Sequence, residues 1–329
     1  MSAMDSVAQL APAPVAVPNE AGARVAVLIP CLNEAPTITK VVADFRRELP
    51  EAAIWVIDNG STDDTARLAG AAGARVIREP RRGKGFAVRA GFRDVDADVY
   101  VLADGDDQTP SESVHELLAP VLAGTADMVV GSRALAGREG SRPANDLGNT
   151  LFSVILRLLM GVQMTDVLSG YRCLSRNLVK GLPLASRNFE VEVELTVKTT
   201  QRSYRLAEVP IRVQPRPDGG VPRLRVIRDG SRILWAIALL FRDYRPMAFF
   251  GAIGFLLGLV ALGILVASAD RDVAGMTSGY VAAILVAIAS MLSVAVGAVL
   301  SVLARRFTEL EGKVDLAVTR GRRADPDDD

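Results

Sequence analysis

Short apolar runs alternate with longer segments of helical periodicity over residues 24–183. Each run is rich in β-branched side chains and too short for a helix, which is typical of buried strands. Strands separated by helices usually form a parallel sheet that the helices cover. This part of the chain therefore predicts an α/β domain with a Rossmann-like, mainly parallel sheet. The predicted strands are residues 25–29, 54–57, 75–77, 99–102 and 128–130.

Helix-start signals lie between these runs. Pro36 suits the first turn of a helix, Asp63 and Asp64 suit the N-terminus of the next, and Pro110 or Ser111 opens a third. Helices are therefore expected between the predicted strands.

Polar side chains gather where three of the predicted strands end. Asn33 and Glu34 follow the first strand, Asp58 follows the second, and residues 104–108 follow the fourth. In open α/β sheets, ligands bind in the crevice beyond the carboxyl ends of the strands. We therefore expect these side chains to converge on one binding site.

The C-terminal third of the chain has a different pattern. Residues 246–269 and 273–304 contain no charged side chain, and each stretch exceeds the roughly 20 residues that cross a bilayer. The alternative is a buried hairpin of a soluble protein, but the many Gly and Ala residues suit close helix packing in lipid. The pattern predicts two transmembrane helices, over about residues 247–269 and 278–304. Small residues in the first helix would also allow association into a homo-oligomer: Gly251, Gly254, Gly258 and Gly263.

A basic segment leads into this hydrophobic region. Residues 205–245 hold nine arginines and four acidic residues. From Leu224 an apolar face runs through Ile227, Ser231, Leu234, Ala238 and Phe241. A basic amphipathic helix fits an anionic membrane surface, whereas a solvated helix packed on the domain is the alternative.

Charges beside the hydrophobic stretches predict the topology. Residues 270–272 are charged and are predicted to form a short turn, whereas Arg242, Arg245, Arg305 and Arg306 lie at the other ends of the two predicted helices. Because positive residues remain on the cytoplasmic side, the α/β domain and the C-terminus are expected in the cytoplasm, on a plasma or inner membrane protein. The predicted organisation is a disordered segment (1–23), an α/β domain (24–223), an amphipathic juxtamembrane helix (224–245), a transmembrane hairpin (246–304) and a cytoplasmic tail (305–329).

Composition excludes several classes of function. The 38 basic and 38 acidic residues balance, so the chain lacks the broad basic field of a nucleic-acid-binding protein. The single histidine, His115, largely excludes histidine-based catalysis. Cys31 and Cys173 are too few and too isolated for a zinc site or a disulfide framework, and we expect both to be buried.

The sequence Asp104-Gly105-Asp106-Asp107-Gln108 directly follows a predicted strand. Carboxylates two residues apart on such a turn can present oxygen atoms to one hard cation, and oxygen ligands suit Mg2+ or Mn2+. A helix-capping acidic turn before Pro110 is the alternative. The turn alone does not decide between them.

Two further strand-end motifs supply context, because residues 29–34 read IPCLNE and residues 57–65 read IDNGSTDDT. Together with the acidic turn they resemble the inverting GT-A glycosyltransferases of family 2. The closer resemblance, over about residues 24–245, is to polyprenol-phosphate hexosyltransferases of the dolichol-phosphate mannosyltransferase and undecaprenyl-phosphate glucosyltransferase type. Two residues depart from the family pattern: Leu32 stands where an aromatic residue is usual, and Asn59 replaces the second Asp of a double-aspartate motif.

The resemblance implies roles for residues on the donor side. Pro30, Asn33 and Glu34 would line the nucleoside pocket, and Asp58 would hydrogen-bond the base or ribose. Asp104, Asp106 and Gln108 would hold the metal and the donor diphosphate, which makes Asp104 and Asp106 catalytic candidates. Lys84, in a turn that matches the family's glycine-rich turn, could reach a donor phosphate because its flanking glycines permit close approach.

On the acceptor side, two segments resemble the family's G-S-R and S-G-F/Y-R motifs: residues 131–133 and 169–172. A guanidinium can bind a phosphate at two points, so Arg133 and Arg142 are candidates for holding an acceptor phosphate, with Ser169 or Arg172 nearby. Arg133 is also a catalytic candidate. Residues 188–195 also resemble a family segment, but their alternating acids fit either a solvated strand or a helix start.

The resemblance implies transfer of one glucose or mannose, with inversion, from a UDP- or GDP-sugar to a polyprenyl phosphate at the cytoplasmic face. Because such an acceptor is already anionic, the reaction needs orientation and a metal more than a strong base. Another acceptor, such as a polysaccharide or glycolipid, is an alternative, although residues 231–235 do not match the Q-x-x-R-W motif of processive synthases. The remaining alternative is a catalytically silent membrane protein that binds nucleotide.

Overall fold

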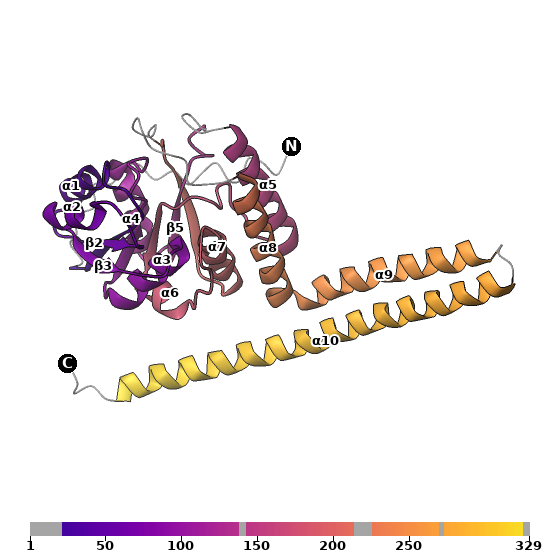
Figure 1. The fold of residues 1–329 in the computed structure, drawn as a ribbon. Coiled ribbons are helices and arrows are strands. Elements are labelled where there is room, and N and C mark those ends of the chain that lie inside the picture. Colours follow the sequence, from indigo (N-terminus) through magenta and orange to yellow (C-terminus); the bar gives the residue numbers. More distant parts are fainter. Residues whose placement is uncertain (1–21, 138–142, 214–225, 270–272, 325–329) are drawn as a thin grey trace, which may run out of the picture. The chain divides into compact units, whose positions relative to one another are not determined.

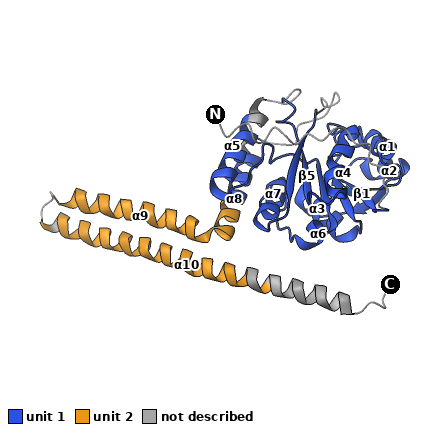
Figure 2. Ribbon diagram, turned by 180° about the vertical axis from the view of Figure 1, so that it is seen from behind, with its two compact units in different colours: residues 1–237 blue, residues 238–329 orange. Residues whose placement is uncertain are grey.

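The computed structural model describes residues 22–137, 143–213, 226–269 and 273–324 (Figure 1). It divides into two compact units, Met1–Ile237 and Ala238–Asp329, which Figure 2 colours separately. The division falls within helix α8 (Val226–Tyr244), slightly before the boundary at residue 245 that the charge pattern predicts.

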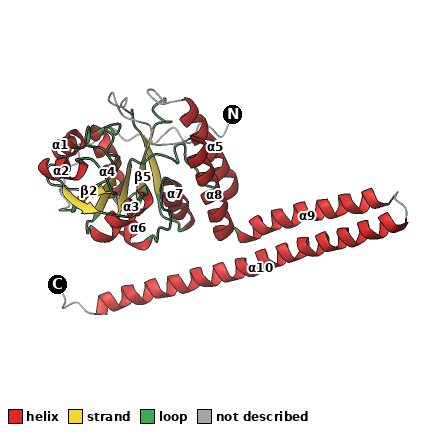
Figure 3. Cartoon of the chain, in the orientation of Figure 1, coloured by secondary structure: helices red, strands yellow, loops and turns green. Residues whose placement is uncertain are grey.

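The first unit is built on a sheet, whose strands are yellow in Figure 3. The sheet has seven strands in the order β3-β2-β1-β4-β6-β5-β7. Strand β6 runs antiparallel to both of its neighbours, and the other pairs are parallel. The expectation of a mainly parallel sheet is therefore confirmed, and all five predicted strands are present. The strands are β1 (Val25–Cys31), β2 (Ala53–Asp58), β3 (Arg75–Arg78), β4 (Val99–Leu102), β5 (Met128–Ser132), β6 (Arg172–Ser175) and β7 (Leu206–Pro210).

Helices follow the strands as the sequence predicts. Helix α2 begins directly after Asp63 and Asp64, and a 3-10 turn begins at Ser111. Residues 188–195 lead into helix α7, which decides between the two alternatives for that segment. The helices of this unit are α1 (Ile38–Glu48), α2 (Thr65–Ala71), α3 (Lys84–Asp94), α4 (Val114–Leu122), α5 (Pro143–Met160), α6 (Arg176–Gly181), α7 (Val191–Gln201) and α8, with the 3-10 turn η1 at Ser111–Ser113.

Alternate residues of the central strands face two hydrophobic layers. On one face, Val27 and Ile29 join the core formed with α1 and α4, where Phe45 is almost fully buried. On the other face, Leu28 packs against Gly91 of α3, where a Cβ atom would lie 3.1 Å from the leucine. Burying each such side chain contributes about 1.5–3 kcal/mol, so both layers hold the strand ends in fixed positions. Both cysteines are buried free thiols, as expected.

The second unit contains a helical hairpin. Helices α9 (Pro246–Ser268) and α10 (Val273–Ala324) lie side by side (Figure 1). The helical segments Pro246–Ser268 and Met276–Phe307 are long and apolar enough to cross a membrane, and few of their side chains are buried in the protein.

Small residues bring the two hairpin helices close together. A Cβ atom on Gly254 would lie 2.7 Å from Val294 Cγ2, and Ser290 Oγ donates a 2.6 Å hydrogen bond to the carbonyl oxygen of Gly254. In contrast, a Cβ atom on Gly251 or Gly263 would have no neighbour within 4 Å. Gly254 thus serves packing within the hairpin, and the homo-oligomer remains a prediction.

Candidate active site

Hydrogen bonds join the loops that follow β1 and β2. Asn33 Oδ1 accepts a 2.7 Å hydrogen bond from Thr62 N, and Asn33 N donates to Ser61 Oγ at 2.9 Å. Asn33 has a positive φ of 53°, a conformation that Asn tolerates better than most residues. Glu34 N also donates to Thr65 Oγ1 at 2.8 Å. The structure therefore brings the first two predicted donor-side motifs together.

Asp58, at the end of β2, is buried beside these loops. Its Oδ1 accepts a 3.1 Å hydrogen bond from Ser61 N, which shapes the turn after the strand. In the parallel register, Pro30 pairs with Ile57 and Cys31 pairs with Asp58. The predicted nucleoside residues Pro30 and Asp58 thus lie on adjacent strands at the same end of the sheet.

Asn59 ties the end of β2 to the loop before α3. Its buried amide nitrogen donates to the carbonyl oxygens of Glu79 and Arg81, at 3.2 and 2.7 Å. Its amide oxygen accepts a 2.6 Å hydrogen bond from Gly83 N. An asparagine can donate and accept at once, whereas an ionised aspartate only accepts. These contacts give a physical reason for the departure from the double-aspartate motif.

Replacing Asn59 with the family's usual residue is expected to impair the protein. In Asn59→Asp a carboxylate would face the two carbonyl oxygens of Glu79 and Arg81, and leaving such buried polar groups unpaired costs about 1–3 kcal/mol each. The unpaired groups would displace the loop that carries Lys84. We expect the KM for the donor to rise roughly tenfold, because an energy of this size corresponds to about that change in affinity. Steady-state kinetics would measure this change. In a Lys84→Ala background the same substitution should add little, and full additivity would contradict this role for Asn59.

Lys84 occupies the centre of the site. Its ammonium group lies 2.5 Å from Asp104 Oδ1 and 2.7 Å from Glu192 Oε1, and the side chain is largely buried. Burial alone would lower the pKa of Lys84, but the two carboxylates more than offset this effect and raise it above its ordinary value. Lys84 is therefore a fixed cation at neutral pH.

The glycines beside Lys84 permit this placement. Gly83 has a φ of 138°, and a Cβ atom there would overlap the carbonyl oxygen of Arg187. A Cβ atom on Gly85 would likewise overlap the carbonyl oxygen of Ser186. The glycines therefore allow a close backbone approach to the loop before α7, whereas the predicted approach to a donor phosphate stays a prediction.

Glu192 is a candidate residue that the sequence did not reveal. It lies in the first turn of α7, is almost fully buried, and its Oε2 has no hydrogen-bond partner among the described residues. The neighbouring acids act differently: Glu190 accepts from Arg187 N and Asn188 N, and Glu194 accepts from Ala185 N and Ser186 N. Only the tertiary structure distinguishes Glu192 from these loop-binding acids.

The three aspartates of the acidic turn after β4 have different partners. Asp107, with a φ of 59°, forms a 2.6 Å ion pair with Lys40 of α1. Asp106 Oδ1 accepts a 3.3 Å hydrogen bond from Gln108 N, and Asp104 remains partly exposed beside Lys84. Asp107 is thus directed toward α1.

The remaining donors of this turn fit a hard divalent cation. Three partly exposed side chains offer oxygen ligands: Asp104, Asp106 and Gln108. The carboxylate of Asp104 already pairs with one cation, the ammonium group of Lys84. Within the described part of the chain, no three His, Cys, Asp or Glu side chains are grouped to hold a metal. An ion here would therefore need ligands besides the two carboxylates, as the amide of Gln108 or a donor phosphate would provide.

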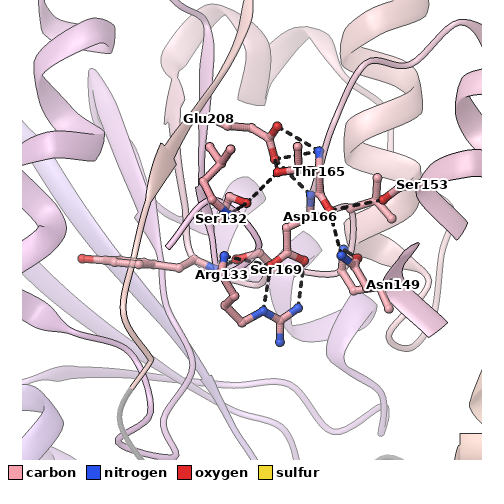
Figure 4. Close-up of polar contacts among 12 residues, drawn as sticks. Ser132, Arg133, Asn149, Ser153, Thr165, Asp166, Ser169 and Glu208 are labelled. Carbon is pink, nitrogen blue, oxygen red and sulfur yellow. Dashed lines mark hydrogen bonds and ion pairs between the residues drawn. The ribbon is translucent and has the colours of Figure 1, made fainter. Parts of the chain in front are cut away.

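Arg133, at the end of β5, is held by a buried carboxylate. Its Nε and Nη2 atoms donate to the two oxygens of Asp166 at 2.7 and 2.8 Å, and its backbone N–H donates at 3.1 Å (Figure 4). Glu208 of β7 fixes the same loop by accepting hydrogen bonds from Thr165 N, Thr165 Oγ1 and Asp166 N. Arg133 is therefore pre-oriented, and about a third of its side chain remains exposed.

Gly170 brings the predicted acceptor segment against the donor side. A Cβ atom on Gly170 would lie 2.6 Å from Asp104 Oδ2 and 2.8 Å from Lys84 Nζ. The neighbouring Ser169 is buried, and its Oγ accepts a 3.4 Å hydrogen bond from Tyr171 N. The two halves of the predicted site thus meet at residue 170.

Arg172 does not lie where an acceptor could reach it. It is fully buried, and its guanidinium donates to the carbonyl oxygens of Ser169 and Val167 and to Thr196 Oγ1, at 2.8, 3.0 and 2.9 Å. Burial lowers its pKa to about 10, and the nearby acids Glu192, Asp166 and Glu208 act in the opposite direction. This placement argues against the predicted contact with acceptor phosphate. Arg142 lies outside the described residues.

We expect Arg172 to contribute to stability. Arg172→Leu would leave two buried carbonyl oxygens and a hydroxyl without their donor, which should reduce the free energy of unfolding by about 3 kcal/mol. Thermal or denaturant unfolding of the purified protein measures this loss. Normal stability combined with a raised acceptor KM would instead restore the predicted acceptor role.

The fold and these strand-end loops are those of a GT-A glycosyltransferase. The chain matches the model of glycosyl transferase family 2 over residues 26–182. Glycosyltransferase AglJ of Haloferax volcanii is 35% identical over 242 residues, which cover 73% of this chain and 79% of the relative. The chain therefore belongs to glycosyltransferase family 2 and is an enzyme of that class.

More specific likenesses confirm the resemblance to polyprenol-phosphate hexosyltransferases. A dolichyl-phosphate hexose transferase of Haloferax volcanii is 34% identical over 208 residues, covering 63% of this chain and 90% of the relative. Among solved structures, glucosyl-3-phosphoglycerate synthase from Mycobacterium tuberculosis with Mn2+, UDP-glucose and phosphoglyceric acid has a TM-score of 0.58 and 27% identity, covering 67% of this chain and 80% of that chain.

Proposed function

We propose that this chain transfers one glucose or mannose from a UDP- or GDP-sugar to a polyprenyl phosphate at the cytoplasmic face of a membrane. The contact of Gly170 with Lys84 and Asp104 carries the proposal, because it joins the predicted donor and acceptor segments. Reaction between two bound substrates requires their reacting atoms to lie about 3–3.5 Å apart. Because Gly170 has no side chain, the acceptor segment can lie close enough to the donor side for such an approach.

On the donor side, Pro30, Asn33, Glu34 and Asp58 bind the nucleoside. Lys84 faces the diphosphate as a fixed cation, and Asp104, Asp106 and Gln108 hold a Mg2+ or Mn2+ ion. When bound, such an ion neutralises charge on the departing diphosphate. The structural neighbour that was solved with Mn2+ and UDP-glucose supports this arrangement.

On the acceptor side, Arg133 orients the phosphate of the lipid. Asp166 holds the guanidinium through its Nε and Nη2 edge, so the cation is positioned without reorganisation during the reaction. A phosphate monoester is already ionised near neutral pH, so no general base has to remove a proton. In-line attack of its oxygen on the anomeric carbon then inverts that centre.

The hairpin of α9 and α10 supports a membrane location, because both helices contain spans of sufficient length. The arginines that flank the spans favour a catalytic unit in the cytoplasm. A soluble phosphorylated acceptor is the second candidate, since the structural neighbour named above was solved with phosphoglyceric acid.

The test uses the full chain in lipid nanodiscs with labelled UDP-glucose or GDP-mannose, Mg2+ or Mn2+, and polyprenyl phosphate. The expected result is a labelled product that extracts into organic solvent. Matched reactions contain the unphosphorylated polyprenol or phosphoglyceric acid instead. No extractable product with either donor would refute the proposal, and a water-soluble product with phosphoglyceric acid would favour the second candidate.

A further inference from the structure

Three groups from different parts of the chain surround the ammonium group of Lys84. Asp104 Oδ1, from the loop after β4, lies 2.5 Å away, and Glu192 Oε1, in the first turn of α7, lies 2.7 Å away. The ring of Phe189 has its centroid 5.9 Å from the same nitrogen, which is within the range of a cation–π interaction. All three groups stabilise a positive charge at this point.

The two carboxylates around Lys84 differ in their access to solvent. The side chain of Asp104 is 38% exposed, whereas that of Glu192 is 3% exposed. A divalent cation from solvent can therefore reach Asp104 but not Glu192. Asp104 is also one of the predicted metal ligands, so the ammonium group and such a cation would bind the same carboxylate. Two cations on one carboxylate repel each other, and partial burial strengthens this repulsion.

Glu192 can hold the ammonium group through a second oxygen atom. Its Oε2 is buried and has no hydrogen-bond partner among the described residues. A buried carboxylate oxygen without a donor is unfavourable, so this atom favours an additional N–H group. An ammonium group has three donors and can bind both oxygens of one carboxylate. The side chain of Lys84 can thus give up Asp104 and gain Glu192 Oε2.

The backbone around Lys84 is held in place, so only its side chain has to move. Carbonyl oxygens of the loop before α7 lie so close to Gly83 and Gly85 that neither glycine could carry a Cβ atom without a shift of the backbone. The same loop leads into α7, the helix that carries Glu192. The turn of Lys84 and the helix of Glu192 are therefore packed against each other, and the distance between them is fixed.

We propose that Lys84 and a divalent cation compete for Asp104, and that Glu192 is the positioning residue that takes up the ammonium group when the cation binds. The competition lowers the affinity for the metal, because the cation gains Asp104 only when Lys84 gives it up. Glu192 reduces this loss through its second oxygen and keeps the ammonium group beside the predicted diphosphate site. The role of Glu192 rests on the proposed function through the cation site, but the sugar, the acceptor and the membrane have no part in it.

Binding of Mn2+ alone to the full chain, in nanodiscs of zwitterionic lipid, tests the competition. The electron paramagnetic resonance signal of free Mn2+ gives the affinity. Lys84→Met removes the competing cation, so the affinity should rise about tenfold, the effect expected from the loss of one charged hydrogen bond. Lys40→Met is the matched control, because Lys40 pairs with Asp107 of the same acidic turn at 2.6 Å. It removes the same charge and should change the affinity by less than about twofold.

Glu192→Gln tests the role of the second carboxylate. Glutamine has nearly the same shape but no charge, so Lys84 should remain on Asp104 and the Mn2+ affinity should fall about tenfold. In a Lys84→Met background the same substitution should have no effect, because Glu192 acts through Lys84. A role of Glu192 in folding alone would lower the unfolding temperature but would not produce this dependence on Lys84.

Three results would overturn the proposal. One is equal changes of Mn2+ affinity in Lys84→Met and Lys40→Met, which would show that only the net charge of the turn matters. Another is the same loss of affinity from Glu192→Gln with and without Lys84. The third is the absence of Mn2+ binding to both the native chain and Lys84→Met.

A shorter carboxylate replaces Glu192→Gln if that variant fails to fold, as circular dichroism would show. Glu192→Asp keeps the charge but lacks one methylene group, so it should not reach Lys84 with both oxygens and the Mn2+ affinity should again fall. Native affinity in this variant would contradict the role of the second oxygen. No donor or acceptor is present in these measurements, so a failure here is distinguishable from a failure of the proposed transfer reaction.

Discussion

Asp106→Asn should lower the rate of sugar transfer by about a thousandfold, which corresponds to roughly 4 kcal/mol of lost transition-state stabilisation. The substitution removes one of two carboxylates from a predicted cation site that has no third one among the described residues. The affinity of the purified protein for Mn2+ should fall in parallel. The electron paramagnetic resonance signal of free Mn2+ measures this affinity. This readout separates the loss of a ligand from a general loss of activity.

Asp107→Asn provides the matched control. Asp107 is the next residue but is paired with Lys40, and Asn tolerates its positive φ of 59°. Lys40 is 55% exposed, and an ion pair that solvent reaches contributes at most about 1 kcal/mol, so this variant should retain near-normal transfer and Mn2+ affinity. Equal losses in the two variants would show that the turn as a whole, rather than Asp106, is responsible. Normal activity in Asp106→Asn would exclude Asp106 from the site.

Gly170→Ala should reduce transfer by about a hundredfold without unfolding the protein, since misplacement of a reacting group by about 1 Å has an effect of this size. The new Cβ atom would lie 2.6 Å from Asp104 Oδ2 and 2.8 Å from Lys84 Nζ. Both are the ends of flexible side chains, so they can move away and the fold is preserved. The movement of Asp104 and Lys84, however, would disturb the donor side of the site, although the substitution itself lies in the acceptor segment. Transfer kinetics and circular dichroism together measure the two effects.

Gly70→Ala is the corresponding control for a glycine substitution. Gly70 lies in α2, where an added Cβ atom would have no neighbour within 4 Å. Alanine is the better helix former by about 1 kcal/mol, so this variant should be slightly stabilised and fully active. Full activity in Gly170→Ala as well would contradict the close contact between the two halves of the site.

The strands in the middle of the sheet could be predicted because both of their faces are buried. Such strands are continuous apolar runs, and β4 is an example, since all four of its residues are buried. Strand β6 begins with Arg172, a charged residue whose burial depends on carbonyl oxygens. Strand β7 is an edge strand with intermediate exposure. Local sequence does not predict either, because Arg172 opens β6 and Glu208 interrupts β7, so neither strand is a continuous apolar run.

The candidate site also contains residues whose placement could be predicted from the sequence and residues whose placement could not. Asn33, Asp58 and Asp104 could be expected to converge, because parallel strands end at one edge of the sheet. Glu192 could not be recognised among alternating acids, since its contact with Lys84 depends on how α7 packs. For Arg172 the residue type suggested phosphate binding, but the fold supplies enough carbonyl acceptors to bury a guanidinium. The type of a side chain thus predicted its chemistry more reliably than its location.

The hydrogen bonds of Asn59 also constrain how this enzyme can be redesigned. The side chain matches three backbone groups of residues 79–83, so the residue and the loop form one exchangeable unit. A chimera that takes the strand-end motif of a relative with aspartate at this position must take that relative's following loop as well. Exchange of the strand-end motif alone would place a carboxylate against the carbonyl oxygens of residues 79 and 81. Exchange of the loop alone would place the Asn59 amide against a loop that is shaped for aspartate.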